Sequence, residues 1–466
     1  MRHLLSRKAA TARARLRRAA SAAALCVCTA LGALALPSTA HAADTPLRDL
    51  AAAKGIHIGN AVAGYKLSGN AQYAAIAGAQ FSSLTPENAM KWSSVEPTRG
   101  SYDWAEADQI VAFAQEHGQQ VRGHTLVWHS QNPGWLTNGG FSAAELRAIL
   151  ERHIATEAGR YRGKIAAWDV VNEMFNEDGT YRPSLWYNAM GPGYVADALR
   201  WARQADPGAK LYLNDYNVEG LNAKSDALYN LVRSLKAQGA PIDGVGLQAH
   251  FILGQVPSTL QANIQRFADL GVDVAITELD VRMQLPATDA KLTQQAADYS
   301  AVVKACLAVS RCVGITGWDI SDADSWVPDV FPGYGAATMY DANYRPKPAY
   351  YAVATALGGG GTTPPPGGGA CTATYAVANQ WGGGFTANVT ITCPPGASLT
   401  NWQAAWDFGA GQRLTHVWNA TCRQEGTRVT CSPAPWNGSV PPGGSVSFGF
   451  NGTWSGSNPI PAVTVG

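Results

Sequence analysis

Two apolar runs in this chain each end in a glutamate. The first covers residues 168–173 (WDVVNE) and ends in Asn172 and Glu173. The second covers residues 274–280 (VAITELD), so that Glu278 follows Glu173 by 105 residues. Each run is typical of a buried strand that carries a carboxylate at its C-terminal tip. Two facing carboxylates are what cleavage of a glycosidic bond requires, because one protonates the leaving oxygen while the other attacks or stabilises the anomeric carbon.

A scaffold for these glutamates is indicated by alternating strand-like and helix-like segments from residue 43 to residue 357. Eight apolar segments predict strands, at Ile56–Val62, Phe81–Leu84, Val121–Trp128, Ile165–Asn172, Lys210–Asp215, Gly244–Ala249, Val272–Thr277 and Val313–Trp318. Helix-like segments lie between them, at Trp104–His117, Ala143–Ala158, Gly193–Gln204, Ser225–Gln238, Leu260–Leu270 and Asp289–Val309. Such alternation predicts a parallel sheet with both faces buried. Eight repeats favour its closure into a (β/α)8 TIM barrel, an α/β fold.

Polar and aromatic residues gather where the predicted strands end. They are His124, Trp128 and His129 for the third strand, Asn172 and Glu173 for the fourth, Asn214, Asp215 and Tyr216 for the fifth, Gln248 and His250 for the sixth, Glu278 and Asp280 for the seventh, and Trp318 for the eighth. Barrels of this kind build their active sites at the C-terminal ends of the strands. The sequence therefore predicts one site to which six strand ends contribute.

Five motifs in this region are rich in uncommon residue types. They are ENAMKW at 87–92, GHTLVWH at 123–129, WDVVNE at 168–173, QAH at 248–250 and TELD at 277–280. In this order they resemble glycoside hydrolase family 10, the endo-β-1,4-xylanases. The resemblance implies that Glu173 is the acid/base, that Glu278 is the nucleophile, and that the anomeric configuration is retained. Such an acid must hold its proton near neutral pH, which calls for a partly desolvated carboxyl beside a negative charge.

The same resemblance assigns roles to residues around the two glutamates. His250 would donate to Glu278 and be oriented by Asp280, and Asn172 would bond the 2-hydroxyl of the sugar that Glu278 holds. The positions that it implies for substrate binding are Glu87, Asn88, Lys91, His124, Trp128, Tyr216, Gln248, Trp318 and Trp326. Taken singly, a lysine is more often a surface charge, and a histidine or a tryptophan is more often part of the core.

The first 42 residues predict a signal peptide. Residues 1–18 contain seven basic side chains and no acid, residues 19–36 are apolar, and AHA at 40–42 is a small-residue cleavage signal. A membrane anchor is the alternative interpretation. Without this segment 28 basic and 34 acidic residues remain, a net charge of −6 with neutral histidine. We therefore expect a secreted, extracellular protein without a nucleic-acid or membrane partner.

Six of the eight cysteines lie beyond the predicted signal peptide and are close together in pairs. The pairs are Cys306 with Cys312, Cys371 with Cys393, and Cys422 with Cys431. An even number in an exported chain favours disulfides. A metal site is the alternative, but no C-x-x-C or H-x-x-x-H spacing accompanies these cysteines. We expect neither a metal nor a cofactor.

A second domain follows a Gly/Thr/Pro linker at 358–369. Residues 370–466 contain short alternating runs, such as 385–391 and 445–450, which predict an antiparallel β-sandwich. The segments NQW at 379–381, WNA at 418–420, WNG at 436–438 and FGF at 448–450 resemble a family 2 carbohydrate-binding module. The resemblance implies an exposed row of Trp381, Trp418 and Trp436. Other expectations are hydroxyl contacts by Asn419 and Gln424, and burial of Trp402 and Trp406.

The resemblances together imply a monomeric, secreted endo-β-1,4-xylanase that acts on xylan and is held on cellulose by its C-terminal module. Two alternatives stay open. The barrel could act more broadly as a β-1,4-glucanase, or it could be a decayed barrel in a non-catalytic polysaccharide-binding protein. The presence of both Glu173 and Glu278 argues against decay.

Overall fold

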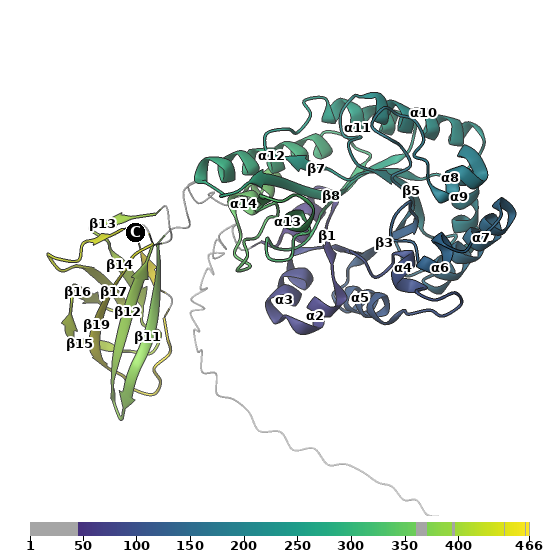
Figure 1. The fold of residues 1–466 in the computed structure, drawn as a ribbon. Coiled ribbons are helices and arrows are strands. Elements are labelled where there is room, and N and C mark those ends of the chain that lie inside the picture. Colours follow the sequence, from purple (N-terminus) through teal and green to yellow (C-terminus); the bar gives the residue numbers. More distant parts are fainter. Residues whose placement is uncertain (1–44, 360–370, 394–396, 442, 462, 466) are drawn as a thin grey trace, which may run out of the picture. The chain divides into compact units, whose positions relative to one another are not determined.

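The structure is a computed structural model, and it describes residues 45–359, 371–393, 397–441, 443–461 and 463–465. The predicted signal peptide at 1–42 and all but the first two residues of the predicted linker at 358–369 lie outside these ranges. Two domains are described, each by itself. The first is a barrel with surrounding helices, and the second is an all-β domain (Figure 1).

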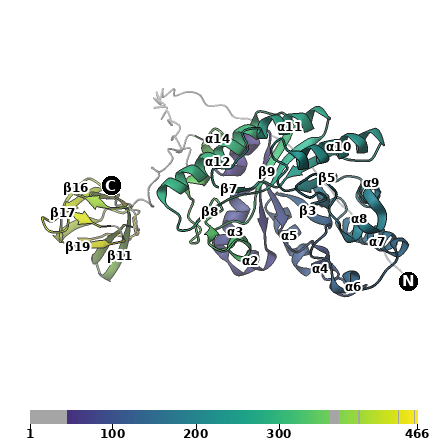
Figure 2. The same ribbon diagram turned by 45° about the horizontal axis from the view of Figure 1, so that its top comes forward.

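Eight parallel strands form a closed barrel. They are β1 (His57–Val62), β2 (Ser83–Pro86), β3 (Gln120–Val127), β4 (Ala167–Asn172), β5 (Lys210–Asp215), β6 (Gly244–Leu247), β8 (Asp273–Gln284) and β9 (Cys312–Gly317). Each strand pairs in parallel with the next, and β9 returns to β1. In Figures 1 and 2 the helices surround this ring of strands. The predicted α/β barrel is confirmed, and β4 and β8 lie three places apart in the ring of eight strands.

Helices follow the strands and cover the outside of the barrel. The longer ones are α3 (Ala71–Gln80), α5 (Ala105–Glu116), α7 (Ala143–Arg160), α9 (Tyr194–Ala205), α10 (Ala223–Ala237), α11 (Leu260–Asp269), α12 (Asp289–Leu307) and α14 (Pro348–Ala356). Helix α7 starts at a capping box, in which Ser142 and Glu145 bond each other's backbone. Asn222 and Ser225 form a capping box on α10. These polar caps satisfy free N–H groups and fix where the helices begin.

The sixth and seventh barrel strands differ from their predicted bounds. The sixth was expected to reach Ala249, but Ala249 has a φ of 66°, and the chain resumes as the short strand β7 (His250–Ile252). The seventh continues to Gln284 because it also pairs with β7 and with β10 (Tyr334–Gly335). Residues two apart in a strand point to the same side. Glu278 and Asp280 are therefore both turned toward His250.

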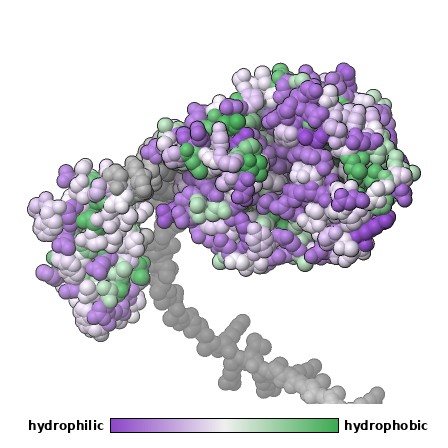
Figure 3. All heavy atoms as spheres, in the orientation of Figure 1, coloured by the Kyte–Doolittle hydropathy of each residue, from purple (hydrophilic) through white to green (hydrophobic). Residues whose placement is uncertain are grey.

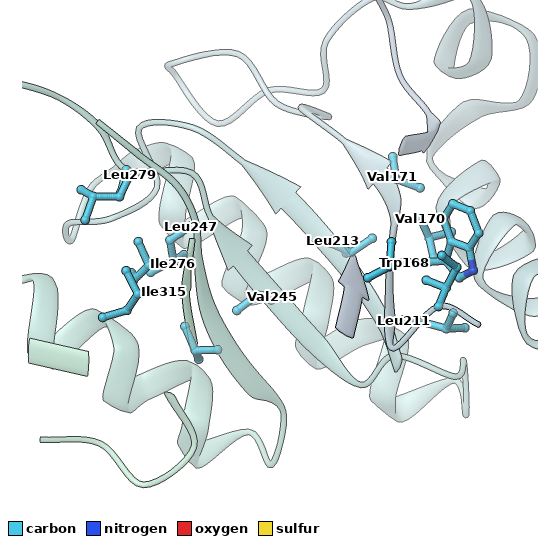
Figure 4. Close-up of a cluster of buried hydrophobic side chains, with 14 of the residues drawn as sticks. Trp168, Val170, Val171, Leu211, Leu213, Val245, Leu247, Ile276, Leu279 and Ile315 are labelled. Atoms are coloured by element: carbon cyan, nitrogen blue, oxygen red, sulfur yellow. The ribbon is translucent and has the colours of Figure 1, made fainter. Parts of the chain in front are cut away.

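The barrel core is built from β-branched and leucine side chains of neighbouring strands. Figure 4 shows ten of them labelled: Trp168, Val170, Val171, Leu211, Leu213, Val245, Leu247, Ile276, Leu279 and Ile315. Trp168 is completely buried and lies directly over Gly123 of the adjacent strand. A Cβ at residue 123 would lie 2.2 Å from the indole ring, so only glycine leaves room for it.

The second domain is a sandwich of two four-stranded sheets. One has the order β11 (Thr372–Trp381), β12 (Gly384–Thr392), β19 (Ser445–Thr453) and β15 (Arg413–Trp418). The other has the order β16 (Ala420–Glu425), β17 (Arg428–Pro433), β14 (Ala404–Asp407) and β20 (Thr464–Val465). Trp402 and Trp406 are buried in the core, where both stack on Phe448. The predicted β-sandwich and the predicted burial of these two tryptophans are confirmed.

All three predicted cysteine pairs form disulfides. Cys306–Cys312 joins the end of α12 to the start of β9. In the sandwich, Cys371 is bonded to Cys393 and Cys422 to Cys431. These bonds tie neighbouring strands in each sheet of the small domain, whose apolar core is limited.

Hydrophilic residues cover most of the visible face of the barrel domain, with hydrophobic residues in scattered patches (Figure 3). Within the described part of the chain, no helix combines the length and the apolar character needed to cross a membrane.

Candidate active site

A cleft of about 660 Å³ opens at the C-terminal ends of the barrel strands. Every substrate-binding position predicted for the barrel lines it, and so do Asn172, Glu173, His250 and Glu278. The complete lining is Glu87, Asn88, Lys91, His124, Trp128, Gln131, Asn172, Glu173, Tyr216, Asn217, Gln248, His250, Glu278, Arg282, Trp318, Trp326, Val330 and Phe331. Asp280 lies behind His250, where it is fully buried. The motifs that are scattered in the sequence thus meet in one site.

Glu278 is held by a donor on each carboxylate oxygen. Its side chain is 6% exposed. Asn214 donates to Oε1 at 2.7 Å, and His250 Nε2 lies 3.1 Å from Oε2. Thr277 in turn donates to the amide oxygen of Asn214 at 2.7 Å, which fixes that amide with its nitrogen toward Glu278. A carboxylate with two such donors is fixed in orientation.

His250 is charged by its surroundings. Burial lowers its pKa, but the charges and hydrogen bonds of Asp280 and Glu278 outweigh burial and raise the pKa to about 10. Its Nδ1 lies 2.9 Å from Asp280 Oδ2, and Trp326 donates to the same oxygen at 2.8 Å. Both ring nitrogens of an imidazolium are donors. His250 is thus held by Asp280 on one side and donates to Glu278 on the other.

Glu173 is also surrounded by donors, which the sequence did not predict. Gln248 donates to Oε1 at 3.2 Å, and His129 Nε2 lies 2.9 Å from Oε2. Burial raises the pKa of Glu173, but hydrogen bonds from His129, Trp128 and Gln248 outweigh burial and lower the pKa to about 2. The expectation of a carboxyl that holds its proton near neutral pH is therefore wrong for the free site. Glu173 is ionised until its contacts change.

Amide side chains connect the two glutamates. Asn214, which donates to Glu278, also contacts the side chain of Asn172. Gln248, which donates to Glu173, contacts the same Asn172 side chain. All three amides are buried. This continuous network leaves little freedom to either carboxylate, and it places Asn172 between the two glutamates.

One end of the cleft contains a chain of polar contacts around Lys91. Asn88 donates to Glu87 at 2.9 Å, and Lys91 donates to Asn88 at 3.0 Å. The ammonium also lies 5.0 Å from the centre of the Trp128 ring. Lys91 is only 7% exposed, and burial lowers its pKa. It is not the solvated surface lysine that its residue type alone would suggest.

Aromatic rings surround the His250 side of the cleft. Trp318 and Trp326 both pack edge-on against the imidazole, with ring centres 6.2 and 4.9 Å from it. Trp318 also packs against His124, whose Nδ1 lies 3.0 Å from Asp169. These side chains are well packed and line the cleft at the same time. Trp318, Trp326 and His124 therefore both pack against their neighbours and form part of the cleft wall.

Several residues in the cleft lining or in contact with its glutamates received no role from the sequence. His129 and Asn214 stand at predicted strand ends, so position alone could have singled them out. Their contacts with the glutamates depend on pairing between distant strands. The other additions had no such signal: Gln131, Asn217 and Phe331 outside helices and strands, Arg282 in β8, and Val330 at the end of the short helix α13 (Val327–Val330).

The three tryptophans singled out in the sandwich differ in exposure. Trp381 is 49% exposed and Trp436 is 74% exposed, whereas Trp418 is partly buried. Trp381 and Trp418 belong to the same sheet, at the ends of β11 and β15. Each lies over a glycine, because a Cβ at Gly384 or Gly449 would overlap its indole. Glycine thus provides a flat backbone support for these rings.

Gln424 does not supply the free amide that was expected of it. Its oxygen accepts from the backbone of Leu414, and its nitrogen donates to the carbonyls of Gln412 and Gly426. These bonds tie β16 to the start of β15. The amide is occupied within the fold, so the expectation that it binds a sugar hydroxyl is wrong.

Comparisons with known proteins agree with this geometry. Residues 46–356 match the family model described as glycosyl hydrolase family 10, and residues 371–466 match the one described as cellulose binding domain. An endo-1,4-β-xylanase of Agaricus bisporus is 53% identical over 287 residues, which are 61% of this chain and 86% of that protein. Endo-1,4-β-xylanase A of Phanerodontia chrysosporium is 49% identical over 315 residues, covering 67% and 77%.

Solved structures agree as well. Native xylanase 10B from Thermotoga maritima superposes with a TM-score of 0.66 at 42% identity, covering 67% of this chain and 98% of that one. Xylanase 10B from Thermotoga petrophila in complex with xylobiose gives the same TM-score and identity, covering 67% and 97%.

Proposed function

This chain belongs to glycosyl hydrolase family 10, and from that premise we propose that it is a secreted, retaining endo-1,4-β-xylanase. It hydrolyses internal bonds of xylan with Glu173 as acid/base and Glu278 as nucleophile. The observation that carries the assignment is the double donor set on Glu278, formed by Asn214 and the charged His250. A carboxylate fixed in direction is suited to attack an anomeric carbon.

The reaction proceeds in two displacements. Glu278 attacks the anomeric carbon while Glu173 gives its proton to the leaving glycosidic oxygen, which yields a covalent glycosyl–enzyme. Glu173, now ionised, removes a proton from a water molecule that attacks the same carbon and releases Glu278. Each displacement inverts the configuration, so the product keeps the configuration of the substrate.

Substrate binding raises the pKa of Glu173, so that its carboxylate takes up a proton from the surrounding water before it donates to the glycosidic oxygen. A sugar chain in the cleft displaces water, and its glycosidic oxygen is an acceptor that competes with the Glu173 carboxylate for the donors around it. Loss of water and of these donors both raise the pKa of a carboxyl. Asn172 lies between the two glutamates, next to the sugar that Glu278 attacks. Its amide is within reach of the 2-hydroxyl, where a contact strengthens in the transition state.

The module adds adhesion to turnover. Trp381 and Trp436 expose apolar rings that suit the faces of pyranose units, and the match to a cellulose binding domain supports cellulose as the surface. We assign export to residues 1–42 on the pattern of basic, apolar and small residues. A monomer is expected, because the proposed chemistry needs residues of one chain only.

The proposal is tested by reducing-sugar release from xylan, carboxymethyl cellulose and mannan, measured side by side for the wild type, Glu173→Gln and Glu278→Gln. We expect release from xylan by the wild type alone. Activity that survives in Glu278→Gln overturns the mechanism. Comparable turnover of carboxymethyl cellulose favours the broader β-1,4-glucanase, and no release from any polymer favours the binding protein.

A further inference from the structure

A buried lysine lies behind Glu173 and outside the cleft. Lys224 is completely buried, and its ammonium has three neighbours. It lies 3.1 Å from Asp215 Oδ1, 3.1 Å from Glu177 Oε1 and 3.3 Å from the centre of the Tyr216 ring. An ammonium has three N–H donors. Each of them therefore has a partner, and none is left for a substrate.

The fold alone does not account for this lysine. Lys224 is the second residue of α10, where the helix macrodipole is positive and disfavours a cation. The cap of α10 is completed by Asn222 and Ser225 without it. Burying a charge is also costly unless it is well paired. Residues that break local rules in this way are expected where function requires them.

Two routes of direct contact lead from this lysine to Glu173. In the first, the Tyr216 ring beneath the ammonium places its hydroxyl to accept from Arg182 at 2.8 Å, and Arg182 Nε donates to the backbone carbonyl of Glu173 at 3.1 Å. In the second, Asp215 accepts at Oδ2 from the backbone N–H of Phe175 at 3.3 Å.

Both routes hold the backbone that directly follows the Glu173 side chain, at the Glu173 carbonyl and at the Phe175 N–H. Glu173 has a φ of 57°, a left-handed conformation that is uncommon for residues other than glycine. Such a conformation persists only where surrounding contacts enforce it. The contacts from Arg182 and Asp215 enforce it together with the backbone bond that the Glu173 N–H donates to the Asn214 carbonyl at 2.8 Å.

Charge also couples the Lys224–Asp215 ion pair to Glu173. Burial raises the pKa of Asp215, Lys224 lowers it and Glu173 raises it again, with a result of about 7. The charged and titratable groups that face Asp215 are Lys224 on α10, Glu173 after β4, Arg182 in the following loop and Tyr194 on α9. Glu177 is paired with Lys224 and not with Asp215.

We propose that Lys224 and Asp215 are positioning residues that hold Glu173 in the geometry for proton transfer. This inference rests on the acid/base role proposed above. Lys224 touches no substrate and acts through Tyr216 and Arg182, while Asp215 acts through the Phe175 backbone and through its charge. The pair thus serves the step in which a proton is given to the leaving oxygen, and not the attack by Glu278.

The test compares two substrates with different needs for an acid. Dinitrophenyl β-xylobioside has a leaving group that departs without a proton, whereas xylotetraose needs one. In Lys224→Met we expect kcat/KM on xylotetraose to fall by about 10- to 100-fold, part of what a general acid contributes. On the dinitrophenyl substrate it should fall less than about threefold. KM for xylotetraose should change little, because Lys224 makes no substrate contact.

A matched control is available at Lys347. This lysine is also buried and ion-paired, 3.0 Å from Asp322, but it does not line the cleft or contact the Glu173 loop. Lys347→Met should lower thermal stability and leave the ratio of the two kcat/KM values at the wild-type level. Equal loss on both substrates in Lys224→Met, as in a merely destabilised protein, overturns the inference.

Asp215→Asn provides a second variant in case Lys224→Met does not fold. Removal of a negative charge that faces Glu173 makes the acid lose its proton more readily. The basic limb of the kcat profile on xylotetraose, which reports the enzyme–substrate complex, should therefore move to lower pH. An unchanged limb contradicts the proposed coupling.

Glu173→Gln is the reference that separates the two proposals. It should lose far more activity on xylotetraose than on the dinitrophenyl substrate. If it does and Lys224→Met does not, the inference fails and the proposed function stands. If Glu173→Gln shows no such difference, the acid/base assignment itself fails, and the inference fails with it.

Discussion

The barrel cleft and the tryptophan face of the sandwich are both proposed to meet sugars, yet they are built in opposite ways. In the cleft the key groups are charged, mostly buried and bonded to each other, as in the set formed by Glu278, His250 and Asp280. On the sandwich the key groups are indoles: Trp381 and Trp436 are exposed, and Trp381 and Trp418 lie over glycines. Fixed charge stabilises a transition state, whereas a flat apolar surface only adheres.

Charge is distributed accordingly. Residues 371–466 contain only five charged side chains, Asp407, Arg413, Arg423, Glu425 and Arg428. Four of them pair with each other, Arg423 with Glu425 and Arg428 with Asp407. The cleft alone is lined by three glutamates, a lysine and an arginine. The comparison implies that changes in one region should affect turnover and changes in the other should affect adhesion.

The largest effect is expected for Glu278→Gln in the full chain. Loss of the nucleophile should lower kcat on xylan by at least about 10⁴-fold. Retention on insoluble cellulose should remain at the wild-type level, measured as the fraction pelleted with the polymer. Reduced retention in this variant would mean that the two regions are not separate in function.

The opposite change is the double variant Trp381→Ala, Trp436→Ala. Removal of both exposed rings should weaken binding to cellulose by about tenfold or more, a value in line with aromatic contacts. Turnover of soluble xylan should not change. Trp402→Ala is the contrasting variant, because this buried ring supports the fold and its loss should cost about 3–5 kcal/mol of stability. Unaltered binding in the double variant would refute the assignment of this face.

Within the cleft, His129→Ala should shift the pH profile. His129 helps to lower the pKa of Glu173 to about 2 in the free site. Without this donor the pKa of Glu173 rises, so the acid keeps its proton to higher pH. The basic limb of the kcat profile on xylotetraose, which reports the enzyme–substrate complex, should then move upward by about one pH unit. A limb that moves downward would show that His129 does not act as a donor to Glu173.

The smallest effect is expected for the Cys306–Cys312 bond. It closes a short loop just before β9, the strand that leads to Trp318, so the unfolded chain is constrained only modestly. Replacing both cysteines by serine should cost about 2 kcal/mol of stability and slightly weaken turnover. Thermal unfolding and xylan assays check this. If neither the unfolding temperature nor the turnover of xylan changes, the hypothesis that this disulfide steadies the approach to Trp318 is wrong.

Much of the barrel was predictable because its pattern is local. Continuous apolar runs marked all eight barrel strands, and β5 has its predicted bounds, Lys210–Asp215. The extension of β8 to Gln284 was not predictable, because it depends on pairing with Tyr334–Gly335 some fifty residues later. The early end of β6 depends on the left-handed backbone at Ala249, a residue type that rarely signals one.

The site was predictable where residues stand at strand ends and less so where tertiary contacts decide. The motifs placed Glu173 and Glu278 at the cleft, but the donors that ionise Glu173 in the free site come from another strand. Lys224 had no signal at all, because a lysine in an amphipathic helix is normally solvated. The role expected for Gln424 was wrong for a different reason. Its amide is bonded to the neighbouring strand, and that contact follows from the strand register, which the sequence does not reveal.

The central claim, that two glutamates act as nucleophile and acid/base in a double displacement, is tested most directly by the stereochemistry of the first product. Proton NMR of xylotetraose hydrolysis, recorded within the first minutes, follows the anomeric signals before mutarotation. We predict that the β-anomer of the newly formed reducing end appears first and the α-anomer only later. Initial formation of the α-anomer would contradict the claim, because it requires a single displacement by water.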